Sequence, residues 1–178
     1  MLKSFKVNDI NELEQLEQKL YLSMDKTLLQ ISSEINSNSS QTLFSKMKFG
    51  GVGFDPLDSK RSLNIVEQIN QSFTYLASFY ALEVLFTEYA RLAPFKLNLG
   101  TAPGSDIESE CSELAAEVFA AVTPTSNQKL KKDINKVLAN DAKLKFVFFM
   151  CPNFELGRQP QLEKENVIVW ALKGTNVI

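Results

Sequence analysis

The acidic segment GSDIESECSELAAEVFAAV holds the side chains best suited to chemistry in this 178-residue chain. It contains five carboxylates and neither lysine nor arginine. If the segment is a β-hairpin whose turn is centred between Cys111 and Ser112, antiparallel pairing places Asp106 opposite Glu117. Opposed residues have Cβ atoms about 4.5 to 5.5 Å apart, a spacing at which two carboxylates can share a divalent cation. The sequence therefore predicts a metal site at Asp106 and Glu117.

Glu117 is the more unusual member of this pair, because it lies in the otherwise apolar stretch LAAEVFAAV. Burying an unpaired charge is costly, so such a glutamate needs a cation or a partner. The alternative to metal binding is structural: a sheet glutamate held by a lysine from a neighbouring helix. Glu108, Glu110 and Glu113 lie near the expected turn and are interpreted as its solvated tip.

The chain contains no histidine, and this restricts the chemistry further. Ser-His-Asp and Cys-His nucleophile systems and histidine-ligated zinc are excluded. Hydrolysis would have to use carboxylates, lysines, hydroxyls, water and hard metal ions with oxygen ligands. Cys111 and Cys151 are too few for a disulfide framework, and we expect free thiols in a reducing cytosol.

Apolar spacing predicts the elements that must position the acid pair. Positions three or four apart predict an amphipathic helix over 8–35, capped by Asn8 or Asp9, and a second helix from 59 or 62 to 91. The Ser-, Asn- and Gly-rich segment 36–56 predicts a loop around a short helix or strand. Pro94 ends the second helix.

After Pro94 the period changes, and the pattern predicts five strands and one helix. The strands are expected at 95–99, 106–110, 114–122, 146–151 and 167–172, and the helix at 127–138. The strand-helix-strand unit within 114–151 predicts a parallel crossover. The fold class is therefore α/β, a mixed sheet flanked by helices, with residues 1–56 as an N-terminal helical extension and 57–178 as the core. No stretch has the length and apolarity of a membrane span, so we expect a cytoplasmic protein without a membrane partner.

The order of elements around the acid pair resembles the PD-(D/E)XK nuclease superfamily, in particular its restriction-endonuclease-like members. The stretches PGSDIES, AAEVFAAV, SNQKLKKDINKVL and KFVFFMCP carry the resemblance, which extends over about residues 64–172. It implies that Asp106 and Glu117 ligate Mg²⁺ or Mn²⁺. It also implies a lysine two residues after the second acid, to help activate the attacking water. That position is Phe119, which can neither bind a metal nor stabilise hydroxide.

The departure at Phe119 leaves two interpretations. Either a lysine from the following helix replaces the missing one, with Lys129 the first choice as a catalytic residue and Lys132 the second, or the site is degenerate and the protein binds without cutting. Glu67 resembles a supporting acid that some members of the superfamily place near the metal, and is equally interpreted as an exposed helix glutamate.

The resemblance implies a metal-dependent DNA endonuclease, or a restriction or defence nuclease component. The alternatives are a catalytically degenerate DNA- or protein-binding module and a small α/β interaction protein without nuclease ancestry. Lys129, Lys132 and Lys136 share one helix face, which could contact DNA phosphates. Because the chain is acidic, with a pI near 5.3, we expect a homodimer or a partner subunit, with the first helix as the contact surface.

Overall fold

The computed structural model describes residues 3–36 and 38–174, which fall into two compact units. The first unit contains the chain up to Leu13 and from Leu76 onward, and the second contains Glu14 to Tyr75. The boundary expected after residue 56 falls inside the second unit. Two long helices, α1 (Ile10–Ile35) and α3 (Ile65–Glu88), contribute residues to both units.

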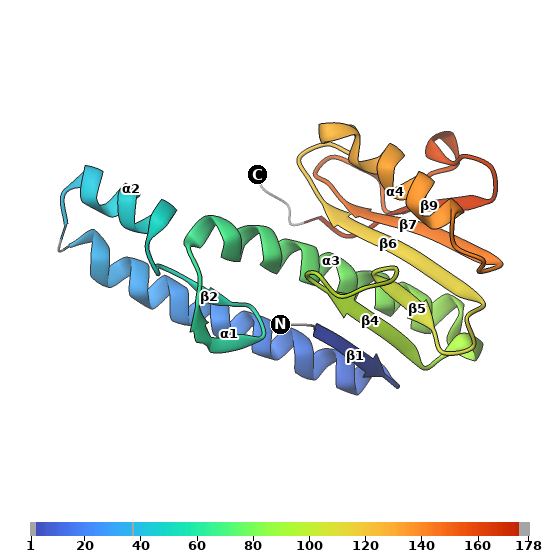
Figure 1. Ribbon diagram of the computed structural model, residues 1–178, viewed down its shortest axis with the longest axis horizontal. Helices are drawn as coiled ribbons and strands as arrows, with labels where there is room; N and C mark the ends of the chain where they lie inside the picture. Colours follow the sequence, from blue (N-terminus) through green and yellow to red (C-terminus); the bar gives the residue numbers. More distant parts are fainter. Residues whose placement is uncertain (1–2, 37, 175–178) are drawn as a thin grey trace. The chain divides into compact units, whose positions relative to one another are not determined.

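The first unit is built on a seven-stranded mixed sheet, which confirms the expected α/β class (Figure 1). Its strands, in spatial order, are β1 (Lys3–Val7), β4 (Phe95–Leu99), β5 (Ile107–Ser109), β6 (Leu114–Ala120), β7 (Leu144–Met150), β9 (Val167–Ala171) and β8 (Gly157–Arg158). The strands from β1 to β6 pair antiparallel, and β6, β7 and β9 pair parallel.

The helix α4 (Lys129–Leu138) makes the predicted parallel crossover between β6 and β7. Its apolar face, Leu130, Ile134 and Val137, packs in one core cluster with β6 and β7 side chains, and Figure 1 shows it lying along that face of the sheet. The end of α3 contributes to the core as well: Phe86 and Phe95 meet edge to face with ring centroids 5.1 Å apart. Because both faces of the sheet are covered at β6 and β7, the sequences of these two strands are nearly continuous apolar runs.

The strand β1, which lies at the start of the expected N-terminal helical extension, was not predicted. KSFKV is short and carries two lysines, so its pattern does not identify it as a strand. It nevertheless pairs with β4 along its whole length, from Lys3 opposite Leu99 to Val7 opposite Phe95. Charged residues are common on edge strands, where they discourage pairing with another chain.

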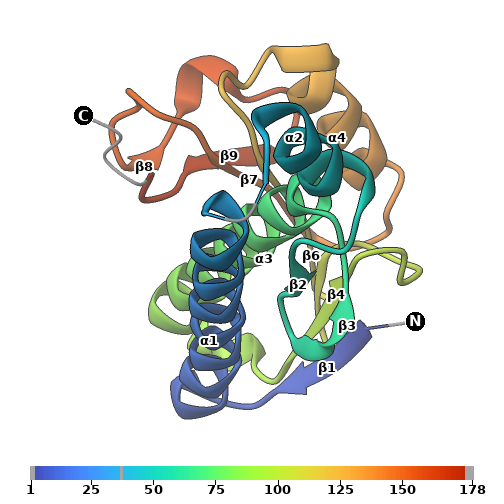
Figure 2. The same ribbon diagram turned by 90° about the vertical axis from the view of Figure 1, so that its left-hand side faces the viewer.

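The second unit combines parts of α1 and α3 with α2 (Ser40–Phe49) and a hairpin of β2 (Phe54–Asp55) and β3 (Asp58–Ser62), coloured blue to green in Figure 2. The predicted early start of the second long helix is wrong. Residues 59–62 belong to β3, and α3 begins after Asn64, whose side-chain oxygen accepts a hydrogen bond from the backbone N–H of Glu67 at 2.9 Å. The predicted cap of α1 is confirmed, because Asp9 accepts from the N–H of Glu12 at 3.0 Å.

Within the described ranges, none of the helices has both the length and the apolarity needed to cross a membrane. Cys111 and Cys151 are both free, as expected.

Candidate active site

The predicted register of the acidic hairpin is confirmed. In β5 and β6, Ile107 lies opposite Ala116 and Glu108 opposite Ala115, so one further step along the ladder brings Asp106 beside Glu117. Asp106 immediately precedes β5, and its carboxylate crosses to β6, where Oδ2 accepts a hydrogen bond from the backbone N–H of Val118 at 2.8 Å. The backbone of β6 therefore fixes the first acid next to the second.

Glu117 is buried on the face of β6 that α4 covers, with only 2% of its side chain exposed. Lys136, from α4, donates a hydrogen bond to Oε2 at 2.6 Å. Oε1 is buried and has no hydrogen-bond partner within the described part of the chain. The lysine contact is the one that the structural interpretation expects, but it satisfies only one of the two carboxylate oxygens.

Asp133 is a third buried carboxylate, which the sequence analysis did not select as a site residue. Its side chain is 4% exposed, and Oδ1 accepts a hydrogen bond from Lys129 at 2.7 Å. Oδ2 is buried without a hydrogen-bond partner among the described residues. A signal was available in the sequence: Asp133 lies three residues after Leu130 and four before Val137, so helical spacing places it at the edge of the buried face.

The three lysines predicted to share one face of α4 differ in their contacts. Lys136 is the one that contacts the acid pair, through Glu117. Lys129 binds Asp133, and its Nζ lies 5.7 Å from the centroid of the Phe119 ring. Lys132 is exposed. We refer to Asp106, Glu117, Asp133, Lys129 and Lys136 as the acid cluster.

Phe119 occupies the hydrophobic core. Its ring stacks on that of Phe149 with centroids 6.0 Å apart, in the cluster that also contains Leu130 and Ile134. The position two residues after Glu117 is therefore buried beneath α4. The ammonium that contacts the acid pair comes from this helix, at Lys136.

Burial dominates the electrostatics of the three acids. Burial, and next to it the charge of Asp106, raises the pKa of Glu117 from 4.5 to about 7, although the hydrogen bond from Lys136 opposes the shift. Burial also raises the pKa of Asp106 against the hydrogen bond from Val118, and that of Asp133 against the one from Lys129. Burial lowers the pKa of Lys136, but its hydrogen bond to Glu117 and the nearby carboxylates raise it more, so the net shift is upward. Burial thus destabilises the charged form of each acid, and a side-chain hydrogen bond with Glu117 lowers the pKa of Asp106 in part, as expected of two adjacent carboxyl groups that can share a proton.

A hard divalent cation fits this donor set. Within residues 3–36 and 38–174, no group of three acidic or sulfur- or nitrogen-bearing ligand residues is arranged to hold a metal. Two carboxylates are nevertheless enough for Mg²⁺, which keeps several of its waters as ligands. The unpartnered Oε1 of Glu117 and the adjacent Asp106 carboxylate are the oxygen donors that such an ion prefers.

Comparison with known proteins gives no relative for the chain: no protein-family model matches it, and no similar curated protein or solved structure is found.

Proposed function

We propose that the protein is a metal-dependent phosphodiester hydrolase acting on DNA, with Asp106 and Glu117 as the metal-binding acids. The observation that carries this proposal is the half-satisfied carboxylate of Glu117, buried beside Asp106 and held by one ammonium. The succession of α3, β4, β5, β6, α4 and β7 agrees with the order of elements that the PD-(D/E)XK resemblance implies, which supports the proposal.

In this proposal the lysine missing at Phe119 is supplied by α4. Lys136 is the first candidate, because its Nζ already contacts Glu117 while 53% of its side chain is exposed and can reach a substrate. Lys129, the candidate favoured from the sequence, donates its hydrogen bond to Asp133 and not to Glu117. Its charge also lowers the pKa of Asp106, so it remains a second cation near the acid pair.

A bound Mg²⁺ would lower the pKa of a coordinated water and polarise the phosphate. The chain's own residues would do the rest. Asp106, fixed by the N–H of Val118, and Glu117 would hold the donor oxygens in place. Lys136 would release Glu117 in part and donate a hydrogen bond to the attacking water or to a phosphate oxygen, which stabilises the charge that develops during attack.

A second function is favoured by Phe119 and by the closed Lys136–Glu117 ion pair: a nuclease fold that binds nucleic acid or protein without cutting. The acid cluster would then be a structural ion-pair network, and the short contact between Lys136 and Glu117 its stabilising bond. Metal binding separates the two functions, because the non-catalytic alternative needs none.

Cleavage of supercoiled plasmid in Mg²⁺ or Mn²⁺ tests the proposal. We expect nicking by the wild type and a loss of roughly 1,000-fold or more in Asp106→Asn and in Glu117→Gln, as is typical for groups that hold a catalytic ion or stabilise developing charge. Lys136→Met should lose about 100-fold, whereas the control Lys132→Met, on the same helix, should cut normally. Calorimetric titration with Mg²⁺ completes the experiment: no cleavage together with no metal binding would favour the binding module.

We also propose that the DNA-binding form is a homodimer or a complex with a partner subunit. In the second unit, α1 carries the exposed apolar residues Leu22, Leu28 and Leu29, of which Leu29 is 73% exposed. Exposed apolar surface of this kind typically marks an interaction site. Light scattering on the wild type and on Leu22→Asp/Leu29→Asp measures the state, and a monomeric wild type would contradict homodimerisation.

A further inference from the structure

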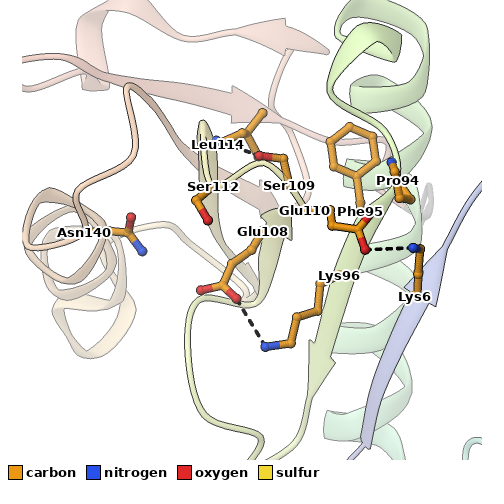
Figure 3. A pocket seen from close by; sticks show the side chains of 10 residues that line it. All are labelled: Lys6, Pro94, Phe95, Lys96, Glu108, Ser109, Glu110, Ser112, Leu114 and Asn140. Carbon is orange, nitrogen blue, oxygen red and sulfur yellow. Dashed lines mark hydrogen bonds and ion pairs between the residues drawn. The ribbon is translucent and has the colours of Figure 1, made fainter.

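A polar pocket of about 400 Å³ lies on the first unit (Figure 3). It is enclosed by the sheet face of β1, β4 and β5, by the hairpin turn and by Asn140, the second residue after α4. Its lining includes Lys6, Lys96, Glu108, Glu110 and Asn140. The volume is in the range of small-molecule sites, and it fits a nucleoside better than a folded partner.

Two residues that line this pocket, Glu108 and Asn140, connect it to the acid pair. Glu108 follows Asp106 by two residues at β5, so both side chains point to the same face, about 6.8 Å apart along the chain. Asn140 lies two residues after the end of α4, and its amide lies 3.5 Å from the hydroxyl of Ser105, the residue before Asp106. A ligand atom at the acid pair would therefore have its neighbouring group in the pocket.

The charges of the pocket are already compensated. Lys6 pairs with Glu110 at 2.7 Å, and Lys96 pairs with Glu108 at 3.5 Å; both pairs are drawn as dashed lines in Figure 3. A pocket with no net charge has little attraction for a phosphate. It does offer carboxylate acceptors next to the half-buried Pro94, which suits an uncharged group that brings N–H donors.

Glu108 is the acceptor best placed to read such a group. Its side chain is 26% exposed, and its bonds from Ser105 N–H, Asn98 Nδ2 and Lys96 Nζ are long, at 3.2, 3.4 and 3.5 Å. A carboxylate has about four acceptor sites, so capacity remains for a donor from a ligand.

We propose that this pocket binds one unpaired nucleobase next to the phosphate at the acid pair, so that the substrate is single-stranded or frayed DNA. The inference rests on the proposed function in that the same strand must reach Asp106 and Glu117. A base within a duplex is stacked and paired, and would have to be extruded before it could enter. Because the pocket presents acceptors, it favours an exocyclic amino group, which brings two N–H donors, over thymine, whose Watson–Crick edge brings the single N3–H between two carbonyl oxygens.

Fluorescence anisotropy in EDTA tests this without requiring metal or cleavage. The probes are labelled eight-nucleotide strands of deoxycytidine and of deoxythymidine, which differ at an amino donor against a carbonyl. We expect the wild type to bind the cytidine strand about ten-fold more tightly, as for one hydrogen bond to a charged group. Glu108→Gln should bind both strands within about two-fold, because a side-chain amide offers a donor as well as an acceptor.

Glu113→Gln is the matched control, since Glu113 lies on the same hairpin but not among the residues lining the pocket, and it should keep the preference for cytidine. Equal binding of the two strands by the wild type, an unchanged preference in Glu108→Gln, or a duplex bound as tightly as the cytidine strand would each overturn the inference. If the protein prefers the cytidine strand but cuts no plasmid, the base-binding pocket is supported and the proposed nuclease function is contradicted. If it cuts plasmid but shows no preference for the cytidine strand, the nuclease function is supported and the base-binding pocket is contradicted.

Discussion

Each of the two units buries a cluster of polar side chains, and the two clusters differ in how completely their hydrogen bonds are made. In the second unit, Gln68 accepts hydrogen bonds from the hydroxyl of Thr27 at 2.6 Å and from the N–H of Phe54 at 2.8 Å, and donates to the carbonyl of Ser23 at 3.3 Å. Ser23 in turn donates to the carbonyl of Asp55 at 2.9 Å. We call these residues the glutamine network.

The acid cluster of the first unit has an incomplete set of hydrogen bonds by comparison, and we call it the open cluster for this reason. Glu117 Oε1 and Asp133 Oδ2 are buried and lack hydrogen-bond partners among the described residues, and the pKa values of all three acids are raised. A completed network lowers the free energy of the fold, whereas an incomplete one raises it unless something else binds. The glutamine network is complete by itself, whereas the acid cluster leaves two buried oxygens unsatisfied, and this difference supports the metal site that we propose there.

The largest expected effect on stability comes from cutting the completed network. Gln68→Leu leaves the Thr27 hydroxyl and the Phe54 N–H without their acceptor, and should lower the free energy of unfolding by about 3 kcal/mol. Urea denaturation measures this change. The control Asn70→Leu replaces an exposed amide on the same helix and should change stability by less than about 0.5 kcal/mol. If Gln68→Leu is as mild as the control, the network is not what holds this unit together.

The open cluster should make stability depend on pH in the opposite sense to an ordinary ion pair. The pKa of Glu117 is about 7 in the folded protein against 4.5 ordinarily, so between these values the folded state holds a proton that the unfolded state has lost. The protonated Glu117 therefore contributes fully to the free energy of unfolding below pH 4.5. This contribution disappears as the pH rises through 7, a loss of at most about 3 kcal/mol.

Urea denaturation from pH 5 to pH 8 checks this dependence. Glu117→Gln should be less sensitive to pH and more stable than the wild type at pH 8, because its amide carries no charge to bury. In Gln68→Leu, the free energy of unfolding should be lower at every pH but should change with pH as steeply as in the wild type. Identical slopes in the wild type and Glu117→Gln would show that the buried acid does not titrate in this range.

A divalent cation should bind the unsatisfied oxygens of the acid cluster and should have no effect on the glutamine network. At ten times its dissociation constant, Mg²⁺ should add about 1.4 kcal/mol to the free energy of unfolding, seen as a higher melting temperature. Asp106→Asn should abolish this gain, whereas Gln68→Leu should retain it. An equal gain in Asp106→Asn would place the ion elsewhere.

The smallest effect is expected at the solvent-facing edge of the cluster. Lys129 is 44% exposed, but its partner Asp133 is only 4% exposed, and Lys129 donates to its Oδ1. Lys129→Met should cost about 1 kcal/mol, the low end for a buried acceptor left without its donor, because Asp133 can take up a proton instead. Denaturation at pH 8 measures the cost. A larger loss would mean that Lys129, and not Lys136, is the principal support of the buried acids.

The sequence predicts the central part of the fold well, because its elements have strong periods. The strands around Phe95, Leu114, Phe146 and Val167 and the crossover helix lie within a few residues of their expected positions, and the hairpin turn fixed the register that brings Asp106 to Glu117. The parallel pairing follows from the single intervening helix.

The remaining errors come from contacts between residues distant in the chain. β1 is too short and polar to be recognised, and becomes a strand through its pairing with β4. The choice among Lys129, Lys132 and Lys136 depends on how α4 is rotated and shifted over β6, which three- and four-residue spacing does not determine. Asp133 was missed because an acid beside apolar helix positions is most often exposed.

The pairing of β1 with β4 has a consequence in time. Lys3 reaches its partner Leu99 only after more than ninety further residues have been made, which takes on the order of ten seconds at ribosomal rates of about 5 to 20 residues per second. The second unit, Glu14 to Tyr75, is complete in sequence well before that. During synthesis the middle of the chain can therefore fold first, while the opening strand waits unpaired and is the segment most open to a chaperone.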